Sequence, residues 1–241
     1  MNYALIFAGG VGSRMNSKAR PKQFLEIHGK PIIVHTIEHF EVHPEIDEIC
    51  VVIVKEWIDY TKEIIKKFNL NKVKWIIPGG ESALASQFNG LDVIRKSSKS
   101  NEKDIVLIHD GVRPLINEKI ISDCIAGVKK YGSAVTVAPA IETIIKTDEQ
   151  NIITETFLRS DCQLARAPQS FFLRDIVCAH EQAKSKGIYD FVDSTSLMLH
   201  FGYKIHTIEG PSENIKVTNP ADFYICRALL DAKENSQIYG I

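Results

Sequence analysis

Short, nearly continuous runs of apolar and β-branched residues recur along the first 140 residues of the chain. Runs of this kind are typical of strands that are buried on both faces of a sheet. The pattern predicts five strands, at residues 3–8, 48–54, 72–78, 104–110 and 133–140.

Segments with helical spacing lie between these runs. In one of them Ile33, Ile37 and Phe40 fall on a single stripe, and another has Gly132 where a helix would end. The alternation of strand and helix predicts an α/β sandwich built around a mostly parallel sheet. The helices predicted in this part of the chain cover residues 32–43, 57–68, 82–94 and 118–132.

The pattern changes at about residue 141. From 141 to 165 apolar and polar residues alternate around TDEQN, which predicts a hairpin with its turn near 148–151. This hairpin is either a projecting arm for subunit contact or an ordinary edge ribbon of the sheet. The rest of the chain predicts helices at 173–186 and 193–201, a strand at 203–210, and a last helix from Pro220 to about residue 233.

Composition narrows the kinds of partner that the chain can have. A hydrophobic content of 44%, a charged content of 24% and a net charge of -1 give no overall attraction to nucleic acid or anionic membrane. No apolar stretch approaches the roughly 20 residues needed to cross a bilayer. With no internal repeat and no linker, the 241 residues are interpreted as a single domain, 1–241, with no nucleic-acid and no membrane partner.

The five cysteines are scattered along the chain, without the spacing of a zinc site or a disulfide framework. Such usage is typical of a reducing compartment. The first residues lack the basic segment and the long apolar run of a signal sequence, so we expect a cytoplasmic location.

A loop rich in glycine and basic residues, AGGVGSRMNSKARPKQF, follows the first predicted strand. It therefore lies at the carboxyl end of a strand, where open α/β sheets bind ligands. Met15 stands where a dinucleotide fingerprint has its third glycine, and the pattern of a P-loop is absent. The loop is either a simple turn or a polyphosphate clamp, and its cations favour the clamp. They are Arg14, Lys18, Arg20 and Lys22.

Asp110 ends the predicted strand 104–110 within the segment LIHDGVRP. A carboxylate at a strand tip beside a phosphate site is a common way to hold Mg²⁺. The alternative is a helix cap or turn aspartate. His109 points to the opposite face of the strand, and we expect it to be packed rather than catalytic.

The segment ENIKVTNPADF places Asn214, Lys216 and Thr218 on one side of an extended stretch. Asn219 and Pro220 then have the residue types that cap and begin a helix. Lys216 is either a site residue or an exposed edge lysine. The basic residues of LRSDCQLARAPQSFF are Arg159 and Arg166, and the simplest interpretation is that both are solvated.

Together these stretches resemble the cytidylyltransferases of sugar and polyol phosphates, the family of methylerythritol-phosphate and ribitol-phosphate cytidylyltransferases. The resemblance implies a Rossmann-like nucleotidyltransferase fold with a protruding β-arm, a homodimer, and Mg²⁺ as cofactor. It also implies that CMP is transferred from CTP to a phosphate monoester, with release of pyrophosphate. The matching pieces are AGGVGSRM, RPKQFLEIHGKPIIVHTIEHF, GG and NGL within 79–91, IHDGVRP, APQSF, and NIKVT followed by Asp222.

The resemblance implies roles for individual residues. Arg14 and Lys22 match the pair that grips the triphosphate, and the arginine that matches Arg159 can come from the arm of the other subunit. The implied catalytic residues are Arg14, Lys22, Arg159 and Lys216; the nucleotide-binding residues are Ala8, Gly9, Gly10, Gly12, Gly80, Ser86 and Asp110; the acceptor-binding residues are Arg113, Arg159, Asp193 and Lys216; and the metal ligand is Asp110.

The chain departs from the family pattern at one position. The segment GGESALAS has Ala83 where the family has an arginine that helps to hold the nucleotide. Loss of that arginine would weaken CTP binding or change substrate choice, unless Arg20 or Lys18 compensates.

The identity of the acceptor is predicted from smaller features. HDGVRP resembles the HDSVRP of ribitol-phosphate enzymes more than the HDAARP of the isoprenoid branch, and Trp57 also favours the former. We expect a CDP-polyol made from CTP and D-ribitol 5-phosphate, or a related polyol or sugar phosphate, for teichoic acid or capsule synthesis. The alternatives are a 2-C-methyl-D-erythritol 4-phosphate cytidylyltransferase and a non-catalytic nucleotide-binding module.

Overall fold

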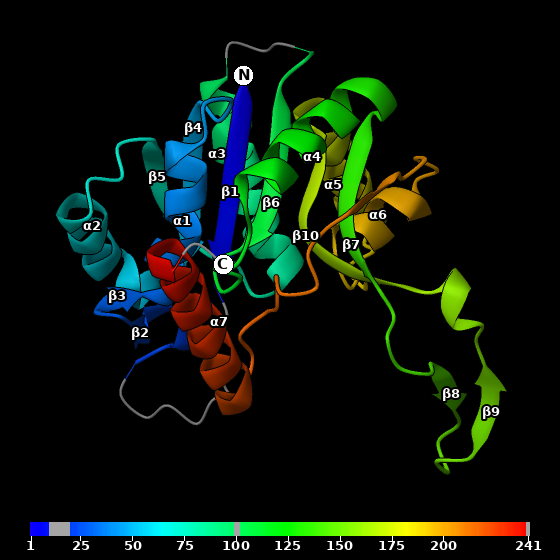
Figure 1. Ribbon diagram of the computed structural model, residues 1–241. Coiled ribbons are helices and arrows are strands. Elements are labelled where there is room, and N and C mark those ends of the chain that lie inside the picture. The colour runs from blue at the N-terminus through cyan, green and yellow to red at the C-terminus, as the bar shows by residue number, and fades with distance from the viewer. Residues whose placement is uncertain (10–19, 99–101, 240–241) are drawn as a thin grey trace.

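A seven-stranded sheet forms the centre of the protein, in a computed structural model that describes residues 1–9, 20–98 and 102–239 (Figure 1). The strand order is β11-β7-β10-β6-β1-β4-β5, and neighbouring strands run parallel except where β10 pairs with β6 and with β7. The predicted mostly parallel α/β fold is confirmed. The strands are β1 (Asn2–Ala8), β4 (Glu48–Ile53), β5 (Val73–Pro78), β6 (Ile105–Asp110), β7 (Ser133–Pro139), β10 (Gln163–Phe172) and β11 (Thr207–Glu209).

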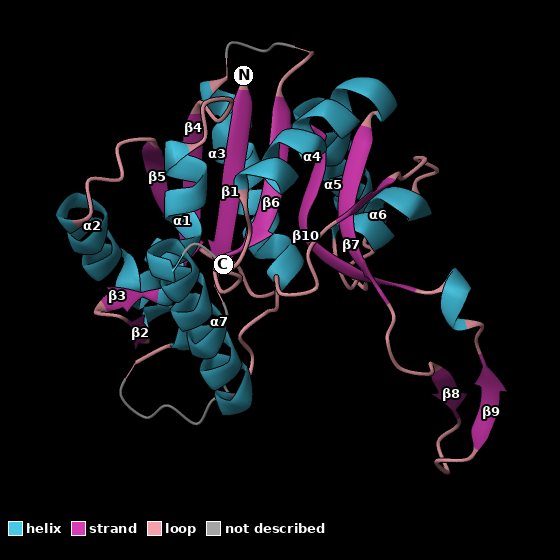
Figure 2. Cartoon of the chain, viewed as in Figure 1, coloured by secondary structure: helices cyan, strands magenta, loops and turns pink. Residues whose placement is uncertain are grey.

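Helices cover both faces of this sheet (Figure 2). The ends of the predicted helices agree closely with the structure over the first 200 residues, and Gly132 ends α4 in the left-handed conformation with a φ of 84°. The last helix continues six residues beyond the predicted end. The helices are α1 (Ile32–Val42), α2 (Ile58–Lys67), α3 (Ala83–Ser97), α4 (Glu118–Tyr131), α5 (Leu173–Lys186), α6 (Ser194–His200) and α7 (Pro220–Tyr239).

The core explains why the strands are apolar on both sides. Alternate residues of β1 pack into two separate clusters: Ala4 and Ile6 lie with α1 and α4, whereas Tyr3 and Leu5 lie with α3, α5 and α6. A strand covered by helices on both faces has no solvent-facing side, so its sequence shows a continuous apolar run.

The antiparallel strand β10 was not predicted. It lies between β6 and β7, and it begins at Gln163, within the segment 141–165 that the sequence assigned to a hairpin. The projecting part is therefore shorter than predicted. The sequence of β10, QLARAPQSFF, contains proline, arginine and glutamine. These residues are uncommon inside a central strand, so the pattern did not indicate one.

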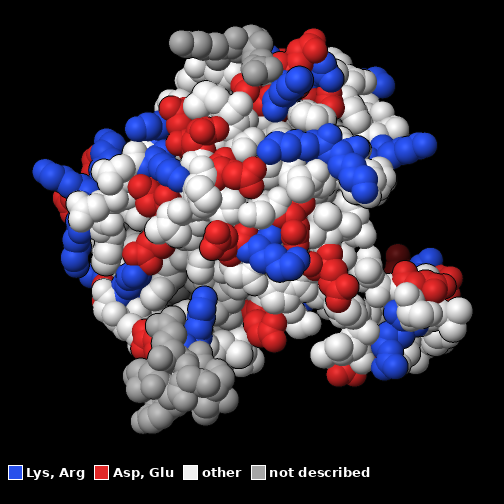
Figure 3. Space-filling model, turned by 45° about the horizontal axis from the view of Figure 1, so that its top comes forward, with Lys and Arg blue, Asp and Glu red and all other residues white. Residues whose placement is uncertain are grey.

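The shorter projecting segment stands apart from the sheet and its helices (Figures 1 and 3), and we call residues 141–162 the arm. It contains the antiparallel pair β8 (Ile145–Thr147) and β9 (Ile153–Thr156), whose residues are all exposed. The predicted turn within 148–151 is confirmed by its hydrogen bonds. A short 3-10 helix, η4 (Arg159–Asp161), leads back to β10.

The remaining elements are small. Strands β2 (Glu26–Ile27) and β3 (Lys30–Pro31) form a separate pair, and 3-10 helices occupy η2 (Lys22–Phe24) and η3 (Lys55–Trp57). The predicted strand 203–210 is reduced to β11. None of the helices in the described ranges has the length and apolar character of a membrane span.

Candidate functional site

The carboxyl ends of three parallel strands meet at one edge of the sheet. In the register of the sheet Phe7 lies opposite Asp110, and Ile53 lies between Ala8 and Pro78. The loops that follow β1, β5 and β6 therefore begin side by side. This is the edge where ligands bind in open α/β sheets.

Two adjoining cavities open at this edge. One, of about 490 Å³, is bordered by the loops after β1 and β5, and we call it the glycine-loop cavity. The other, of about 210 Å³, is bordered by β10 and the start of α6, and we call it the β10 cavity. Both are lined by Phe7, Ala83, Asp110 and Lys216. These four residues mark the place where the two cavities meet.

The glycine-loop cavity contains most of the nucleotide-binding residues that the resemblance implies. Its lining includes Ala8, Gly9, Lys22, Gly80 and Ser86. Three other implied residues, Gly10, Gly12 and Arg14, lie outside the described residues, as does Lys18.

Ser86 holds the loop after β5 against the start of α3. Its hydroxyl accepts a hydrogen bond from the Gly80 N–H at 3.0 Å and donates one to the Ser82 carbonyl at 2.8 Å. A Cβ atom on Gly80 would lie 2.7 Å from the Ala85 side chain, so only glycine fits there. The close approach brings the loop backbone to the first turn of a helix, an arrangement suited to an anionic ligand.

Gln23, for which no role was predicted from the sequence, fixes the other wall of the glycine-loop cavity. It is buried in η2, and its Nε2 donates a hydrogen bond of 2.9 Å to the carbonyl of Ala8. This bond ties the element that carries Lys22 to the end of β1. The only sequence signal was its place in the PKQ motif.

Asp110 forms ion pairs with two cations at the meeting point of the cavities. Its Oδ1 lies 2.6 Å from Nζ of Lys216, and its Oδ2 lies 2.7 Å from Nε of Arg113. Burial alone would raise the pKa of Asp110, but the attraction of Lys216 and Arg113 and their hydrogen bonds outweigh it and lower the pKa. The carboxylate is therefore ionised at neutral pH.

The two cations differ in exposure. The side chain of Arg113 is 9% exposed and also donates from Nη1 to the Asn214 carbonyl at 2.9 Å, whereas the side chain of Lys216 is 40% exposed. Arg113 is thus held by the protein, and Lys216 extends into the space where a ligand would lie.

Asp193 lies in the β10 cavity, as its implied role in acceptor binding requires. Its Oδ2 accepts a hydrogen bond of 2.7 Å from Nε2 of Gln169, and its Oδ1 accepts one of 2.8 Å from the Ser196 N–H. Gln169 in turn accepts from the Thr195 N–H at 3.1 Å. Gln169 therefore links β10 to the start of α6, and the APQSF motif contained it without indicating this contact.

Arg159 is not brought to the cavities within this chain. It lies in η4 of the arm, where its Nη1 donates to the Ile141 carbonyl at 3.3 Å, and it lines neither cavity. A role for Arg159 in the site would require another subunit or a movement of the arm.

Ala83 is the first residue of α3 and lies in the wall of both cavities. An arginine at this position would thus reach the site. The predicted compensation by Arg20 stays a prediction: its guanidinium is 3.5 Å from Glu26 and lies over the ring of Tyr60. Arg20 lines neither cavity.

His109 is fully buried, as predicted, and its ring packs 5.2 Å from that of Phe40. Burial lowers the pKa of His109 to about 3, so the ring is neutral at neutral pH. It contributes to packing and has no contact with either cavity.

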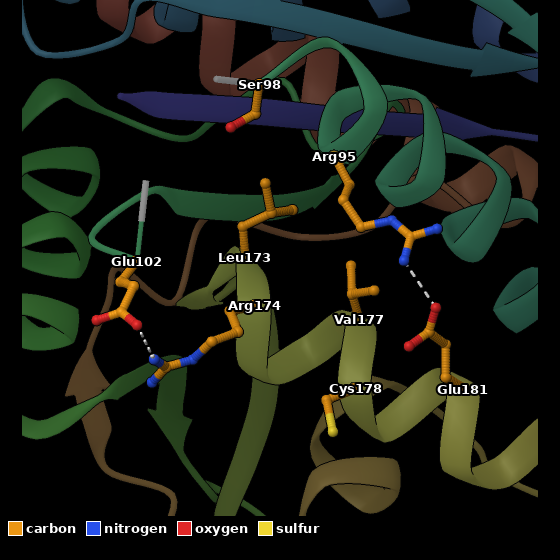
Figure 4. Close-up of a pocket in the computed structure, with 8 residues that line it drawn as sticks. All are labelled: Arg95, Ser98, Glu102, Leu173, Arg174, Val177, Cys178 and Glu181. Carbon is orange, nitrogen blue, oxygen red and sulfur yellow. Dashed lines mark hydrogen bonds and ion pairs between the residues drawn. The ribbon is translucent and has the colours of Figure 1, made fainter. Parts of the chain in front are cut away.

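A third hollow, of about 420 Å³, lies at the opposite edge of the sheet, between the end of α3 and the start of α5 (Figure 4). It contains none of the predicted site residues. Each arginine in it pairs with a carboxylate, Arg95 with Glu181 at 2.7 Å and Arg174 with Glu102 at 3.5 Å. Neither arginine among the described residues that line this hollow is therefore left for an anionic substrate.

Comparisons with known proteins agree with this geometry. The family model described as IspD, 2-C-methyl-D-erythritol 4-phosphate cytidylyltransferase, matches residues 3–232. Among curated relatives, a ribitol-5-phosphate cytidylyltransferase of Vibrio parahaemolyticus is 49% identical over 240 residues, and one of Streptococcus agalactiae serotype III is 50% identical over 241 residues. Each alignment covers 100% of both chains.

A solved structure is also similar throughout the chain. It is the crystal structure of a 4-diphosphocytidyl-2C-methyl-D-erythritol synthase from Anaerococcus prevotii, with a TM-score of 0.82 and 26% identity. The match covers 95% of this chain and 96% of that one. The likeness therefore extends over the sheet and the helices that cover it.

Proposed function

The chain belongs to the 2-C-methyl-D-erythritol 4-phosphate cytidylyltransferase family, and from this premise we propose that it transfers CMP from CTP to D-ribitol 5-phosphate. The products are CDP-ribitol and pyrophosphate. The observation that carries this choice of acceptor is the full-length identity of 49% and 50% to relatives named ribitol-5-phosphate cytidylyltransferase. An assay of pyrophosphate release with a panel of acceptors tests it.

The second candidate acceptor is 2-C-methyl-D-erythritol 4-phosphate. It is favoured by the description of the family model and by that of the similar solved structure, which is only 26% identical. Since both acceptors are phosphate monoesters of a polyol, the same cavities serve either one. They differ in chain length and branching, which the wall of the β10 cavity would distinguish.

The two cavities suggest a division of the substrates. The glycine-loop cavity has close-packed backbone and Lys22, which suit cytidine and the triphosphate of CTP. The β10 cavity has Asp193, Gln169 and Arg113, which suit the hydroxyl groups and the phosphate of a polyol phosphate. The reacting atoms would then meet at the shared wall, beside Lys216.

The reaction follows from this placement. An oxygen of the acceptor phosphate attacks the α-phosphorus of CTP, the bond from that phosphorus to the bridging oxygen breaks, and pyrophosphate leaves with the electron pair. The attacking oxygen is already anionic, so no general base is required. Lys22 and Lys216 contribute by holding two anions in line and by stabilising the charge that builds up between them.

Mg²⁺ fits the residues at the meeting point. Asp110 supplies carboxylate oxygens there, and although each oxygen pairs with a cation, each keeps further lone pairs. Mg²⁺ commonly takes one or two protein carboxylates and completes its shell with substrate phosphates and water. We assign Asp110 as its protein ligand; the ion, when bound, would offset the charge of the triphosphate. No group of three or more His, Cys, Asp and Glu side chains in the described ranges forms a metal cage.

The arm supports a homodimer. An isolated two-stranded ribbon is marginally stable in water, and this one lies away from the body with many exposed apolar side chains. Packing of the arm against a second copy of the chain would bury them and bring Arg159 to the partner's site. The exposed apolar residues of the arm and of the strand it leads to are Ile141, Ile145, Ile152, Ile153, Phe157, Leu158 and Leu164.

The cysteines support a cytoplasmic location for the reaction. All five are free thiols, and three of them are buried, which fits a reducing compartment such as the cytoplasm.

The third candidate, a binding module without activity, is disfavoured by the charged cluster of Asp110, Arg113 and Lys216. A module that only bound a nucleotide would have no need of a lysine placed between two cavities.

A further inference from the structure

Arg166 belongs to an irregular part of β10. Ala165 lies opposite Val137 of β7 and Gln169 lies opposite Val135, so residues 166–168 of β10 occupy the place of one residue in β7. Extra residues of this kind redirect side chains, and they are frequent beside active sites. Here the irregular segment brings the side chain of Arg166 into the wall of the β10 cavity.

Among the described residues, none forms an ion pair with the guanidinium of Arg166. Its Nε is buried and has no hydrogen-bond partner in the described part of the chain. Other arginines differ: Arg113 pairs with Asp110, and Arg95 and Arg174 of the remote hollow pair with glutamates (Figure 4). A partly buried cation with an unmet donor is stabilised when an anion from outside the chain binds to it.

The surroundings of Arg166 make that anion a phosphate rather than a carboxylate of the protein. Burial and the charge of Arg113 both lower the pKa of Arg166, although an arginine stays protonated in proteins. Two guanidinium groups at one cavity repel each other unless an anion lies between or beside them. The nearby carboxylates are engaged, Asp110 by Arg113 and Lys216, and Asp193 by Gln169 and the start of α6.

The position of Arg166 distinguishes the two substrates. It lines the β10 cavity together with Lys216, and it is absent from the lining of the glycine-loop cavity. An anion held by Arg166 would therefore belong to the molecule in the β10 cavity. The guanidinium has a planar fork of donors that matches phosphate oxygens in pairs.

We infer that Arg166 is a substrate-binding residue that holds the phosphate group of the acceptor from within the same subunit, in the cavity that Lys216 also lines. The inference rests on the proposed function, since it assigns the β10 cavity to a polyol phosphate. It adds Arg166 to Arg113, which lines the same cavity, and to the arm arginine that the family resemblance implies.

Steady-state kinetics on Arg166→Ala, Arg166→Gln and Arg166→Lys test this assignment. The KM for ribitol 5-phosphate should rise roughly 10- to 100-fold in the alanine and glutamine variants, since hydrogen bonds to charged groups are among the stronger ones. The KM for CTP should stay within about twofold, and Arg166→Lys should recover part of the loss. Arg174→Gln, at the remote hollow, is the matched control and should leave both KM values unchanged.

Calorimetric titration with the same polyol phosphate, without CTP, separates binding from turnover. The inference is supported if Arg166→Gln binds the acceptor more weakly while its thermal unfolding midpoint equals that of the wild type. If the wild type is active and all three variants keep the wild-type KM for the acceptor, the inference is wrong. It is also wrong if only the KM for CTP rises in the variants. If the wild type releases no pyrophosphate but binds polyol phosphates, and the Arg166 variants bind them more weakly, the proposed function is wrong and the binding role of Arg166 stands.

Discussion

Nζ of Lys216 lies 2.6 Å from Oδ1 of Asp110, although 105 residues separate them in the chain. The contact joins the loop before α7 to the end of β6, at the wall that the two cavities share. An ammonium group held at this point is ready to contact phosphates that enter from either side. Its neighbour Arg113 satisfies the second carboxylate oxygen, so Lys216 can move to a substrate without leaving Asp110 unpaired.

We predict that Lys216→Met lowers kcat by about 10²–10³, the usual cost of removing one donor that stabilises transition-state charge. Stability should change little, because the buried carboxylate of Asp110 keeps its ion pair with Arg113 when Lys216 is removed. Pyrophosphate release and thermal unfolding measure the two effects. Lys119→Met, which removes an exposed lysine paired with Asp123 on α4, is the control and should behave like the wild type.

Lys22→Ala should also lower kcat by about 10²–10³ while the fold remains intact, because Lys22 lines the glycine-loop cavity where the triphosphate is expected. Circular dichroism and pyrophosphate release report on fold and turnover. Lys62→Ala, on the exposed face of α2, provides the comparison. A Lys22→Ala enzyme with a near-normal rate would remove Lys22 from the triphosphate site.

Stability should fall in mild acid because of buried histidines. Burial lowers the pKa of His180 from 6.5 to about 4, and its Nε2 has no hydrogen-bond partner. Because the unfolded chain takes up this proton first, the free energy of unfolding falls by up to about 1.4 kcal/mol per pH unit from pH 6.5 downward, until the folded pKa is reached.

Urea unfolding at pH 7, 6 and 5 compares the wild type with His180→Leu. The variant should show a shallower loss of stability between pH 6 and pH 5, by about 1.2 kcal/mol. Equal slopes for the two proteins would mean that His180 is accessible to protons in the folded state.

Mixing two inactive variants tests the role of the arm. If Arg159 acts across a dimer, a heterodimer of Arg159→Ala and Lys216→Met subunits contains one complete site, made from Lys216 of one subunit and Arg159 of the other. Random exchange of equal amounts should then restore about one quarter of the wild-type rate. A mixture no more active than its parents would show that Arg159 does not complete a partner's site.

The sequence predicted the strands and helices that have a regular pattern. Strands β1, β4 and β6 are apolar throughout because helices cover both faces, and the helices show a stripe or an end signal such as Gly132. Strand β10 was missed because its polar residues serve the β10 cavity rather than the core. The local pattern of apolar and polar residues does not indicate a strand whose side chains line a cavity instead of packing in the core.

The site was predicted in part for a similar reason. Motifs placed Asp110, Lys216 and Asp193 at the functional edge, and the structure brings all three to the β10 cavity. Gln169 and Arg166 were not assigned, since the contacts of Gln169 depend on α6 and the position of Arg166 depends on the irregular segment of β10. Arg159 remains a prediction, because its place in a site depends on a second subunit.

The most direct test of the whole account is pyrophosphate release by the wild-type protein with CTP and Mg²⁺, measured across ribitol, ribulose, xylulose, erythritol and methylerythritol phosphates. We predict the highest kcat/KM with ribitol 5-phosphate and little release when Mg²⁺ is chelated. Preference for 2-C-methyl-D-erythritol 4-phosphate, or no release with any acceptor, would contradict the proposed function.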